Sequence, residues 1–141
     1  MKIQRLITIC FLSLALPFLA EGQSKKRPKS KEIPPLQYGV ASFYHNKFEG
    51  RKTSNGEIFS QKKLTAASNT LPLNSWVKVT NLSNKRSVMV KITDRMHHNN
   101  KRLIDLSRAA ASKLAYLGKG LTRVKVEYLG SKKPVEELAT K

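Results

Sequence analysis

Three segments of this chain alternate between apolar and polar residues, and this pattern restricts the folds open to it more than any other. The segments are residues 76–82 (WVKVTNL), 87–93 (SVMVKIT) and 122–129 (TRVKVEYL). A period of two places every second side chain on one face of an extended strand, so each segment is predicted to be a half-buried β-strand. A further strand is expected to begin at residues 40–44. The Ser-Asn-Lys-Arg sequence between the first two segments favours a hairpin turn in which Asn84 takes a positive φ.

One segment has the pattern of an α-helix. Residues 108–117 (RAAASKLAYL) follow Ser107, which is suited to cap the helix, and precede Gly118, which is suited to end it. Short strands, long loops and a single short helix favour a small, mainly β fold. We therefore expect a small β-barrel rather than a sandwich or a βαβ array.

The N-terminus has the features of an export signal. Two positive charges in residues 1–5 precede an apolar run at residues 6–20, which is short for a transmembrane helix. Small residues at Ala20 and Gly22 predict cleavage after Gly22, which would make residues 1–22 a signal peptide. The alternative is an uncleaved anchor, but Pro17 and the short run argue against it. We therefore expect a periplasmic or secreted protein with no membrane-spanning segment.

The remaining chain divides into three parts by composition. Residues 23–36 are polar, basic and proline-containing, which predicts a disordered linker. Residues 37–130 are expected to form the folded domain. Residues 131–141 are predicted to be a polar tail, in which residues 135–138 could form a short helical turn.

Several kinds of chemistry have no support in this sequence. Cys10 is the only cysteine and lies within the predicted signal peptide, so the exported chain would have no thiolate, disulfide or cysteine-ligated zinc. His97 and His98 are adjacent and His45 is isolated, so no histidine-based metal site is predicted. Neither a G-x-S-x-G motif nor a glycine-rich phosphate loop occurs.

The charge of the chain is strongly unbalanced. It contains 27 lysines and arginines against nine acidic residues, which gives a formal net charge of +18. Nucleic acid is the usual partner of so basic a protein. Export argues against nucleic acid, and anionic lipid or an anionic cell-wall polymer becomes the better expectation.

The folded region contains few acids, so each can be examined as a catalytic candidate. They are Glu49, Glu57, Asp94, Asp105 and Glu127. Glu127 is assigned to the solvent face of a strand. Asp105 stands two residues before Ser107, so capping of the helix is its preferred role. Glu49 lies in a polar loop with no evident constraint.

Glu57 and Asp94 remain as the catalytic candidates. Glu57 follows an Asn-Gly turn, and Asp94 ends a predicted strand. A carboxylate at a strand end stands at the rim of a barrel, where loops build sites. For Asp94, pairing with Arg95 or with loop amides is the simpler alternative.

A series of short motifs then resembles a known family. In order, the chain carries GVASFY (39–44), FEGR (48–51), TSNGE (53–57), LTAA (64–67), LPL (71–73), VTNL (79–82), TDR (93–95) and IDLSRAAA (104–111). This series closely resembles the rare lipoprotein A family, the RlpA-like septal lytic transglycosylases, over about residues 38–130. The resemblance implies a six-stranded double-psi β-barrel with one or two short helices, a fold shared with expansins.

The resemblance also implies an activity and its partners. Members of the family cleave the β-1,4 bond between N-acetylmuramic acid and N-acetylglucosamine in peptidoglycan, favour strands stripped of stem peptides, and leave a 1,6-anhydro end. It implies a lyase without metal or organic cofactor that acts as a monomer. Peptidoglycan strands are the expected partner, cell-wall and division proteins are further candidates, and nucleic acid is not expected.

The motifs assign roles to individual residues. By the resemblance, Asp94 is the acid/base, and Glu57 orients it or stabilises positive charge in the transition state. If the two lie close together, one is expected to have a raised pKa. Arg95 is expected to bind substrate or tune Asp94, and Tyr44 to stack on a sugar.

Basic residues and two substitutions complete the expected site. Four residues flank the Glu57 turn and are candidates to bind the lactyl carboxylates of stripped glycan: Arg51, Lys52, Lys62 and Lys63. Ser60 and Ser68 replace an aspartate and a histidine that are common in the family, and Ser68 is retained as a hydrogen-bonding substrate contact. These replacements favour the alternative of an expansin-like module that binds cell-wall glycan without cutting it.

Overall fold

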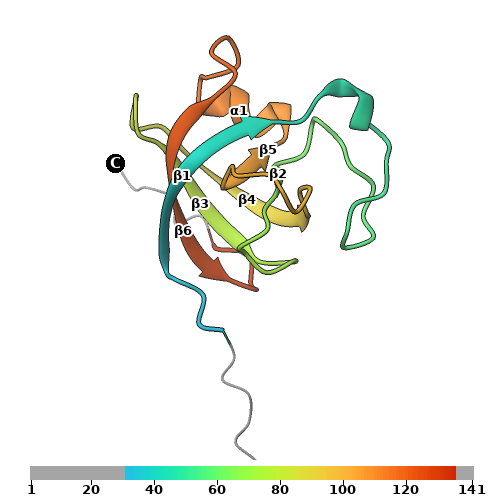
Figure 1. Cartoon of the computed structure of the whole chain (residues 1–141), viewed down its shortest axis with the longest axis horizontal. Coiled ribbons are helices and arrows are strands. Elements are labelled where there is room, and N and C mark those ends of the chain that lie inside the picture. The colour runs from blue at the N-terminus through green and yellow to red at the C-terminus, as the bar shows by residue number, and fades with distance from the viewer. Residues whose placement is uncertain (1–30, 136–141) are drawn as a thin grey trace, which may run out of the picture. The chain divides into compact units, whose positions relative to one another are not determined.

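The structure, a computed structural model, describes residues 31–135 (Figure 1). The predicted signal peptide, Cys10, most of the predicted linker and residues 136–141 lie outside the described residues. The strands are β1 (Leu36–Phe43), β2 (Thr65–Ala67), β3 (Trp76–Asn81), β4 (Ser87–Asp94), β5 (Ile104–Leu106) and β6 (Thr122–Gly130). The helices are the 3₁₀ helix η1 (Asn46–Phe48) and the α-helix α1 (Arg108–Lys113).

The six strands form a closed barrel in the order β1-β5-β2-β4-β3-β6. β1 pairs in parallel with β5 and β2 with β4, while the other four pairings are antiparallel. The short strands β2 and β5 lie side by side in the barrel wall between the long strands β1 and β4 (Figure 1). The expectation of a small, mainly β, six-stranded barrel with one or two short helices is confirmed.

The alternating segments fill the barrel with aliphatic side chains. Alternate residues are buried along most of β3, β4 and β6, and the aliphatic ones among them are Val77, Val79, Val88, Val90, Ile92, Val124 and Val126. Their neighbours Trp76, Lys78, Met89 and Lys91 point out of the barrel. This is the arrangement that a period of two predicts for strands with one buried face.

The hairpin between β3 and β4 forms as predicted, but its turn differs in one residue. Lys85, not Asn84, has the positive φ, at 64°. The Asn84 side chain instead accepts a hydrogen bond from the Arg86 amide and donates one to the carbonyl of Leu114. These two contacts hold Asn84 in ordinary backbone geometry and shift the left-handed residue by one position.

Helix α1 begins as predicted and ends early. The Ser107 hydroxyl caps it by accepting a hydrogen bond from the Ala110 amide. The helix ends at Lys113 rather than at Leu117, and Ala115 then has a φ of 56°. The Leu114 carbonyl, which would otherwise belong to a continuing helix, accepts hydrogen bonds from the Asn84 and Asn81 side chains. These tertiary contacts explain the early end.

The barrel also incorporates residues at both ends that were assigned to linker and tail. Ile33 packs against the core, the Pro35 carbonyl accepts a hydrogen bond from the Tyr128 amide, and β1 already begins at Leu36. After β6, the Lys133 ammonium lies 5.7 Å from the centre of the Trp76 ring. The prediction of disorder is therefore wrong for residues 33–36. Between residues 31 and 135, no helix has the length and apolar character needed to cross a bilayer.

Candidate active site

The turn at residues 53–57 is fixed to the end of strand β4. The Asn55 amide donates to the carbonyl of Thr93 (3.0 Å), and the Thr53 amide donates to that of Glu57 (2.8 Å). The Asn55 side chain accepts hydrogen bonds from the Thr53 hydroxyl and the Glu57 amide, and Gly56 has a φ of 91°. This is the Asn-Gly turn expected from the sequence, and it places Ser54 beside Asp94.

Asp94, the last residue of β4, accepts four hydrogen bonds. Its Oδ1 accepts from the Ser54 amide (3.0 Å), the Ser54 hydroxyl (2.7 Å) and the Arg95 amide (2.9 Å). Its Oδ2 accepts from the Tyr44 hydroxyl (2.7 Å). The carboxylate is thus held in one orientation by the residue after β4, the 53–57 turn and the residue after β1.

These hydrogen bonds determine the ionisation of Asp94. Partial burial disfavours the charged form, but hydrogen bonds from Ser54 and Tyr44 and from the Arg95 and Ser54 amides outweigh it, so the pKa of the Asp94 carboxyl is lowered. A raised pKa at one carboxyl was expected only if Glu57 and Asp94 lay close together. Donors rather than a second carboxylate surround Asp94, so its pKa is lowered instead.

Tyr44 bonds to one carboxylate oxygen of Asp94, and Ser54 bonds to the other. Its ring stacks on Phe59 with centroids 4.2 Å apart and meets Phe48 edge-on at 5.6 Å. Burial, followed by the hydrogen bond to Asp94 and the nearby negative charges, raises the pKa of the Tyr44 hydroxyl, which therefore remains a neutral donor. One face of the ring is covered by Phe59, so the geometry favours positioning of Asp94 over the predicted stacking on sugars.

Asp94 lies where two hollows of the surface meet. The smaller, of about 210 Å³, is also lined by Tyr44, Arg51 and Lys52. The larger, of about 520 Å³, is also lined by Tyr44, Arg95 and Asp105. The structure thus brings Asp94 together with the predicted residues Tyr44, Arg51, Lys52 and Arg95.

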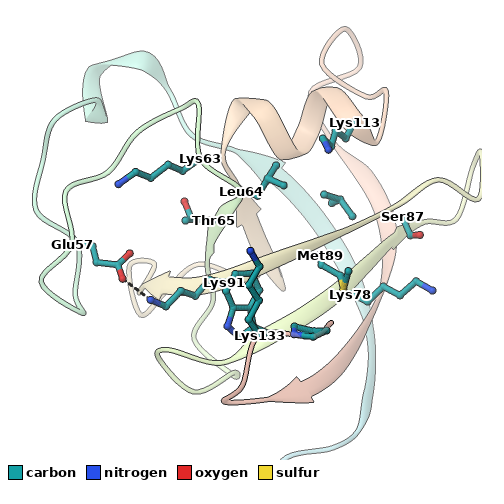
Figure 2. A pocket seen from close by; sticks show the side chains of 13 residues that line it. Glu57, Lys63, Leu64, Thr65, Lys78, Ser87, Met89, Lys91, Lys113 and Lys133 are labelled. Atoms are coloured by element: carbon teal, nitrogen blue, oxygen red, sulfur yellow. Dashed lines mark hydrogen bonds and ion pairs between the residues drawn. The ribbon is translucent and has the colours of Figure 1, made fainter. Parts of the chain in front are cut away.

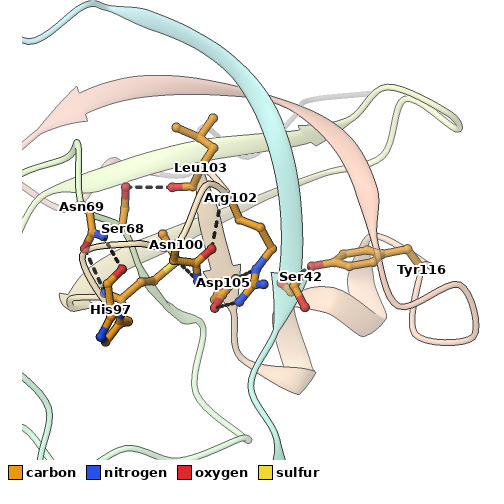
Figure 3. Close-up of polar contacts among 10 residues, drawn as sticks. Ser42, Ser68, Asn69, His97, Asn100, Arg102, Leu103, Asp105 and Tyr116 are labelled. Atoms are coloured by element: carbon orange, nitrogen blue, oxygen red, sulfur yellow. Dashed lines mark hydrogen bonds and ion pairs between the residues drawn. The ribbon is translucent and has the colours of Figure 1, made fainter.

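Asp105 shares the larger hollow with Asp94, which the sequence did not indicate. The prediction that it caps α1 is wrong: it lies in β5, and its carboxylate accepts two hydrogen bonds from the Arg102 guanidinium, at 2.8 and 2.9 Å (Figure 3). Asp94 and Asp105 are both register partners of Ala67 on β2. The sequence carries no signal of this, because it results from the pairing of β2 with two strands that are distant in the chain.

Glu57 faces away from the hollows around Asp94. Its carboxylate forms an ion pair with the Lys91 ammonium at 2.6 Å and lines a separate groove of about 650 Å³ (Figure 2). Ser54, near the other end of the turn, instead donates to Asp94. The 53–57 turn therefore points Ser54 toward Asp94 and Glu57 toward Lys91. The structure does not bring the two predicted catalytic carboxylates into one hollow.

The Arg95 and Ser68 side chains donate hydrogen bonds to backbone carbonyls of the protein itself. Arg95 donates through Nη1 to the carbonyls of Ser68 (2.5 Å) and Leu71 (2.6 Å), which braces the loop after β2. Ser68 is fully buried, and its hydroxyl donates to the Leu103 carbonyl at 2.9 Å (Figure 3). Its assignment as a substrate contact is therefore wrong, because the side chain does not reach the surface.

The remaining polar residues considered in the sequence lie outside the contacts around Asp94 described above. Lys63 lines the same groove as Glu57, and the Ser60 hydroxyl accepts a hydrogen bond from the Lys62 amide. The His97 and His98 rings lie 4.3 Å apart, while His45 caps η1. Within residues 31–135, no three His, Cys, Asp or Glu side chains gather into a metal-binding group.

Comparison with known proteins connects this geometry to a family. Residues 37–126, which span most of the barrel, match the family described as Lytic transglycolase. Two relatives are both named endolytic peptidoglycan transglycosylase RlpA. The one from Pasteurella multocida is 48% identical over 113 residues, and the one from Haemophilus influenzae is 49% identical over 113 residues. The matches cover 79% of this chain but 38% and 39% of those relatives, so the chain corresponds to about two fifths of their length.

Solved structures support the fold at lower identity. A Streptomyces papain inhibitor superposes with a TM-score of 0.56 at 23% identity and covers 69% of this chain and 96% of its own. An expansin from Clavibacter michiganensis superposes with a TM-score of 0.55 at 19% identity and covers 71% of this chain and 52% of its own. At these identities, the likeness concerns the barrel itself.

Proposed function

This chain belongs to the Lytic transglycolase family, whose fold is the double-psi β-barrel, and we propose that it is an exported lytic transglycosylase of peptidoglycan. It would cleave the β-1,4 bond between N-acetylmuramic acid and N-acetylglucosamine within glycan strands and leave 1,6-anhydro ends. The observation that carries this proposal is the carboxylate of Asp94, which four hydrogen bonds orient at the junction of two hollows, beside Arg51 and Lys52.

The reaction needs one group that first gives and then takes a proton. Protonated Asp94 donates to the glycosidic oxygen, and the bond from that oxygen to the anomeric carbon of muramic acid breaks. The 6-hydroxyl of the same sugar attacks the anomeric carbon, and its proton returns to Asp94. The carboxyl group ends in its starting state, and no water is consumed.

The hydrogen bonds indicate which oxygen of Asp94 would act. Oδ1 already accepts three hydrogen bonds, from two donors of Ser54 and from the Arg95 amide. Oδ2 accepts one, from Tyr44. Oδ2 therefore has the greater capacity to carry the transferable proton, and we assign this role to it. Tyr44 and Ser54 take the orienting role that the sequence had suggested for Glu57.

The charge around the hollow suits stripped glycan. Each muramic acid without a stem peptide exposes a lactyl carboxylate, which a cation can bind. Arg51 and Lys52 line the smaller hollow with Asp94, and the Arg51 guanidinium lies 5.3 Å from the centre of the Phe48 ring. An arginine held against an aromatic ring is well placed for a carboxylate.

A second candidate function follows from the ionisation of Asp94. A carboxyl group with a lowered pKa is mostly ionised at neutral pH and donates a proton poorly. This favours the alternative of a module that binds cell-wall glycan without cutting it. Both functions have the same expected partner, peptidoglycan strands outside the cytoplasm, and neither requires a cofactor. Monomeric action and contact with cell-wall or division proteins are further parts of the proposal.

Digestion of stem-peptide-free peptidoglycan distinguishes the two functions. The wild-type chain should release fragments with 1,6-anhydro ends that mass spectrometry detects. The Asp94→Asn variant should release them at least about a hundredfold more slowly, which is the lower range for loss of a general acid. If neither protein releases fragments while both sediment with the polymer, binding without cleavage is the function.

A further inference from the structure

The groove that contains Glu57 is a separate basic surface, which we call the lysine groove. It encloses about 650 Å³ and shares no lining residue with the two hollows around Asp94. Its lysines come from five separate parts of the chain (Figure 2), and these residues are Lys63, Lys78, Lys91, Lys113 and Lys133. The fold therefore collects cations that the sequence disperses between residues 63 and 133.

The alternation of the β3–β4 hairpin builds the floor of the groove. Trp76 pairs with Lys91, and Lys78 pairs with Met89, all on the outward face. Leu64 and Pro134 add apolar side chains at the margin. The groove thus combines an apolar floor that contains an indole ring with a rim of ammonium groups.

The charge of the groove is only slightly compensated. Among the lining residues that the structure describes, Glu57 is the one carboxylate, and it forms an ion pair with Lys91. Lys133 lies over the Trp76 ring at 5.7 Å. Among residues 31–135, no ion pair to a carboxylate involves Lys63, Lys78 or Lys113. Several like charges around one hollow repel each other and attract an anionic ligand.

We propose that the lysine groove is a second glycan-binding site, which holds a carboxylate-bearing stretch of glycan strand away from the cleavage point. The choice of polymer rests on the proposed function. Sugar rings present apolar C–H faces to an indole, and the lactyl groups of stripped strands present carboxylates to lysines. A membrane surface is less suitable, because these lysines surround a hollow rather than protrude from a convex face.

The 53–57 turn connects the groove to the candidate catalytic residue. Ser54, at one end of the turn, binds Asp94, while Glu57, at the other, lies in the groove. A strand that leaves the hollows around Asp94 along this turn would enter the lysine groove. The groove would therefore raise affinity for long strands without changing the chemistry at the cleaved bond.

Trp76 allows a direct test, because it is the only tryptophan in the chain. The full chain carrying Asp94→Asn is titrated with a stem-peptide-free oligosaccharide that contains muramic acid, and with an N-acetylglucosamine oligomer of equal length. Trp76 fluorescence should respond to the first with an affinity at least about tenfold higher than to the second. Equal responses overturn recognition of the carboxylates. If calorimetry detects binding while Trp76 fluorescence does not change, the oligosaccharide binds elsewhere and the proposed site is overturned.

Charge reversal provides the second test. Lys78→Glu combined with Lys113→Glu should weaken sedimentation with stripped peptidoglycan at least about tenfold. The control combines Lys119→Glu with Arg123→Glu, which changes the net charge equally at exposed positions that do not line the groove. Equal weakening by both pairs shows an effect of net charge alone and overturns the proposal. If the groove variant does not fold, the Trp76 titration decides.

The outcomes separate this site from the proposed activity. If the wild-type chain releases no anhydro ends but Trp76 still responds to the muramic oligosaccharide, the groove is supported and the enzymatic function fails. If the wild type cleaves while the groove variants bind like the control, the groove fails and the function stands. A stronger response to phosphatidylglycerol vesicles or to single-stranded DNA than to glycan also overturns the proposal.

Discussion

Asp94 accepts more hydrogen bonds than any other carboxylate in the part of the chain that the structure describes. Four donors stabilise the ionised form, so the same contacts that orient the group also oppose its protonation. A proton donor with a lowered pKa works best in acid. We therefore expect cleavage to become faster as the pH falls from neutral toward the pKa of Asp94.

Removal of the Tyr44 hydroxyl tests this coupling. In Tyr44→Phe, Asp94 loses one donor, so its pKa should rise toward the ordinary value and the pH optimum of cleavage should move upward. The measurement is the pH–rate profile on stripped peptidoglycan. Tyr116→Phe is the control, because the Tyr116 hydroxyl donates to the Ser42 carbonyl instead. An optimum that stays in place in Tyr44→Phe would refute the assigned role of Tyr44.

The lowered pKa of Asp94 also predicts how stability depends on pH. Above the ordinary carboxyl pKa of about 3.9, Asp94 is ionised in both states and its hydrogen bonds stabilise the fold. As the pH falls below that value, the unfolded chain takes up the proton first, and the free energy of unfolding decreases. Asp94→Asn should flatten this decrease, as measured by urea unfolding at pH 6 and at pH 3. An unchanged slope would contradict the prediction.

At the scale of elements, the 53–57 turn is the part that assembles the site. Its backbone bonds to β4, it aligns Ser54 with Asp94, and it directs Glu57 to Lys91. Gly56, with a φ of 91°, allows this geometry, and a Cβ added there would meet only the Lys52 side chain, at an ordinary contact distance of 4.0 Å. A side chain there would strain the backbone without causing a collision.

Gly56→Ala should affect both stability and activity. It should lower the unfolding free energy by about 1 kcal/mol, and it should also slow cleavage, because displacement of Ser54 removes support from Asp94. Gly120→Ala is the matched control, because Gly120 also has a positive φ, of 79°, in open space but lies in a different loop. The two variants should lose similar stability in thermal unfolding. Similar cleavage rates in both would show that the turn does not position Asp94.

The sequence predicted the long elements better than their ends. β3, β4 and β6 follow from alternation, and the Ser107 cap follows from a short-range rule. The predictions for the end of α1 and for the residue with positive φ in the hairpin turn were wrong, because the Asn81 and Asn84 side chains donate to the Leu114 carbonyl. Such contacts join residues about 30 positions apart, and a local pattern does not contain them.

At the scale of the whole molecule, the excess of lysine and arginine should govern association with the cell wall. A net charge of +18 attracts an anionic polymer over distances that salt shortens. Sedimentation with stripped peptidoglycan should therefore weaken steeply between about 0.05 and 0.5 M salt, as the screening length falls from about 14 to 4 Å. Binding to neutral chitin should change little over the same range. Equal salt dependence for the two polymers would argue against charge as the driving force.

The candidate site was predictable in composition but not in arrangement. Asp94 and Tyr44 were singled out from motifs and Arg51 and Lys52 from their charge beside the Glu57 turn, and the barrel brings the four together. Glu57 was placed with them and Asp105 was placed apart, and the structure reverses both assignments. The direction of a side chain at a turn and the register between distant strands are both set by tertiary pairing.

The sequence by itself determined that the chain forms a small barrel of half-buried strands, because a period of two admits only one buried face for each strand. It also determined that few acids are available for catalysis and that the surface is basic. The tertiary structure decided which acid stands in the open hollow, which one is neutralised by Lys91, and where dispersed lysines converge. Closure of the barrel sets these positions, since it pairs β2 with both β4 and β5 and so brings Asp94 and Asp105 to either side of Ala67.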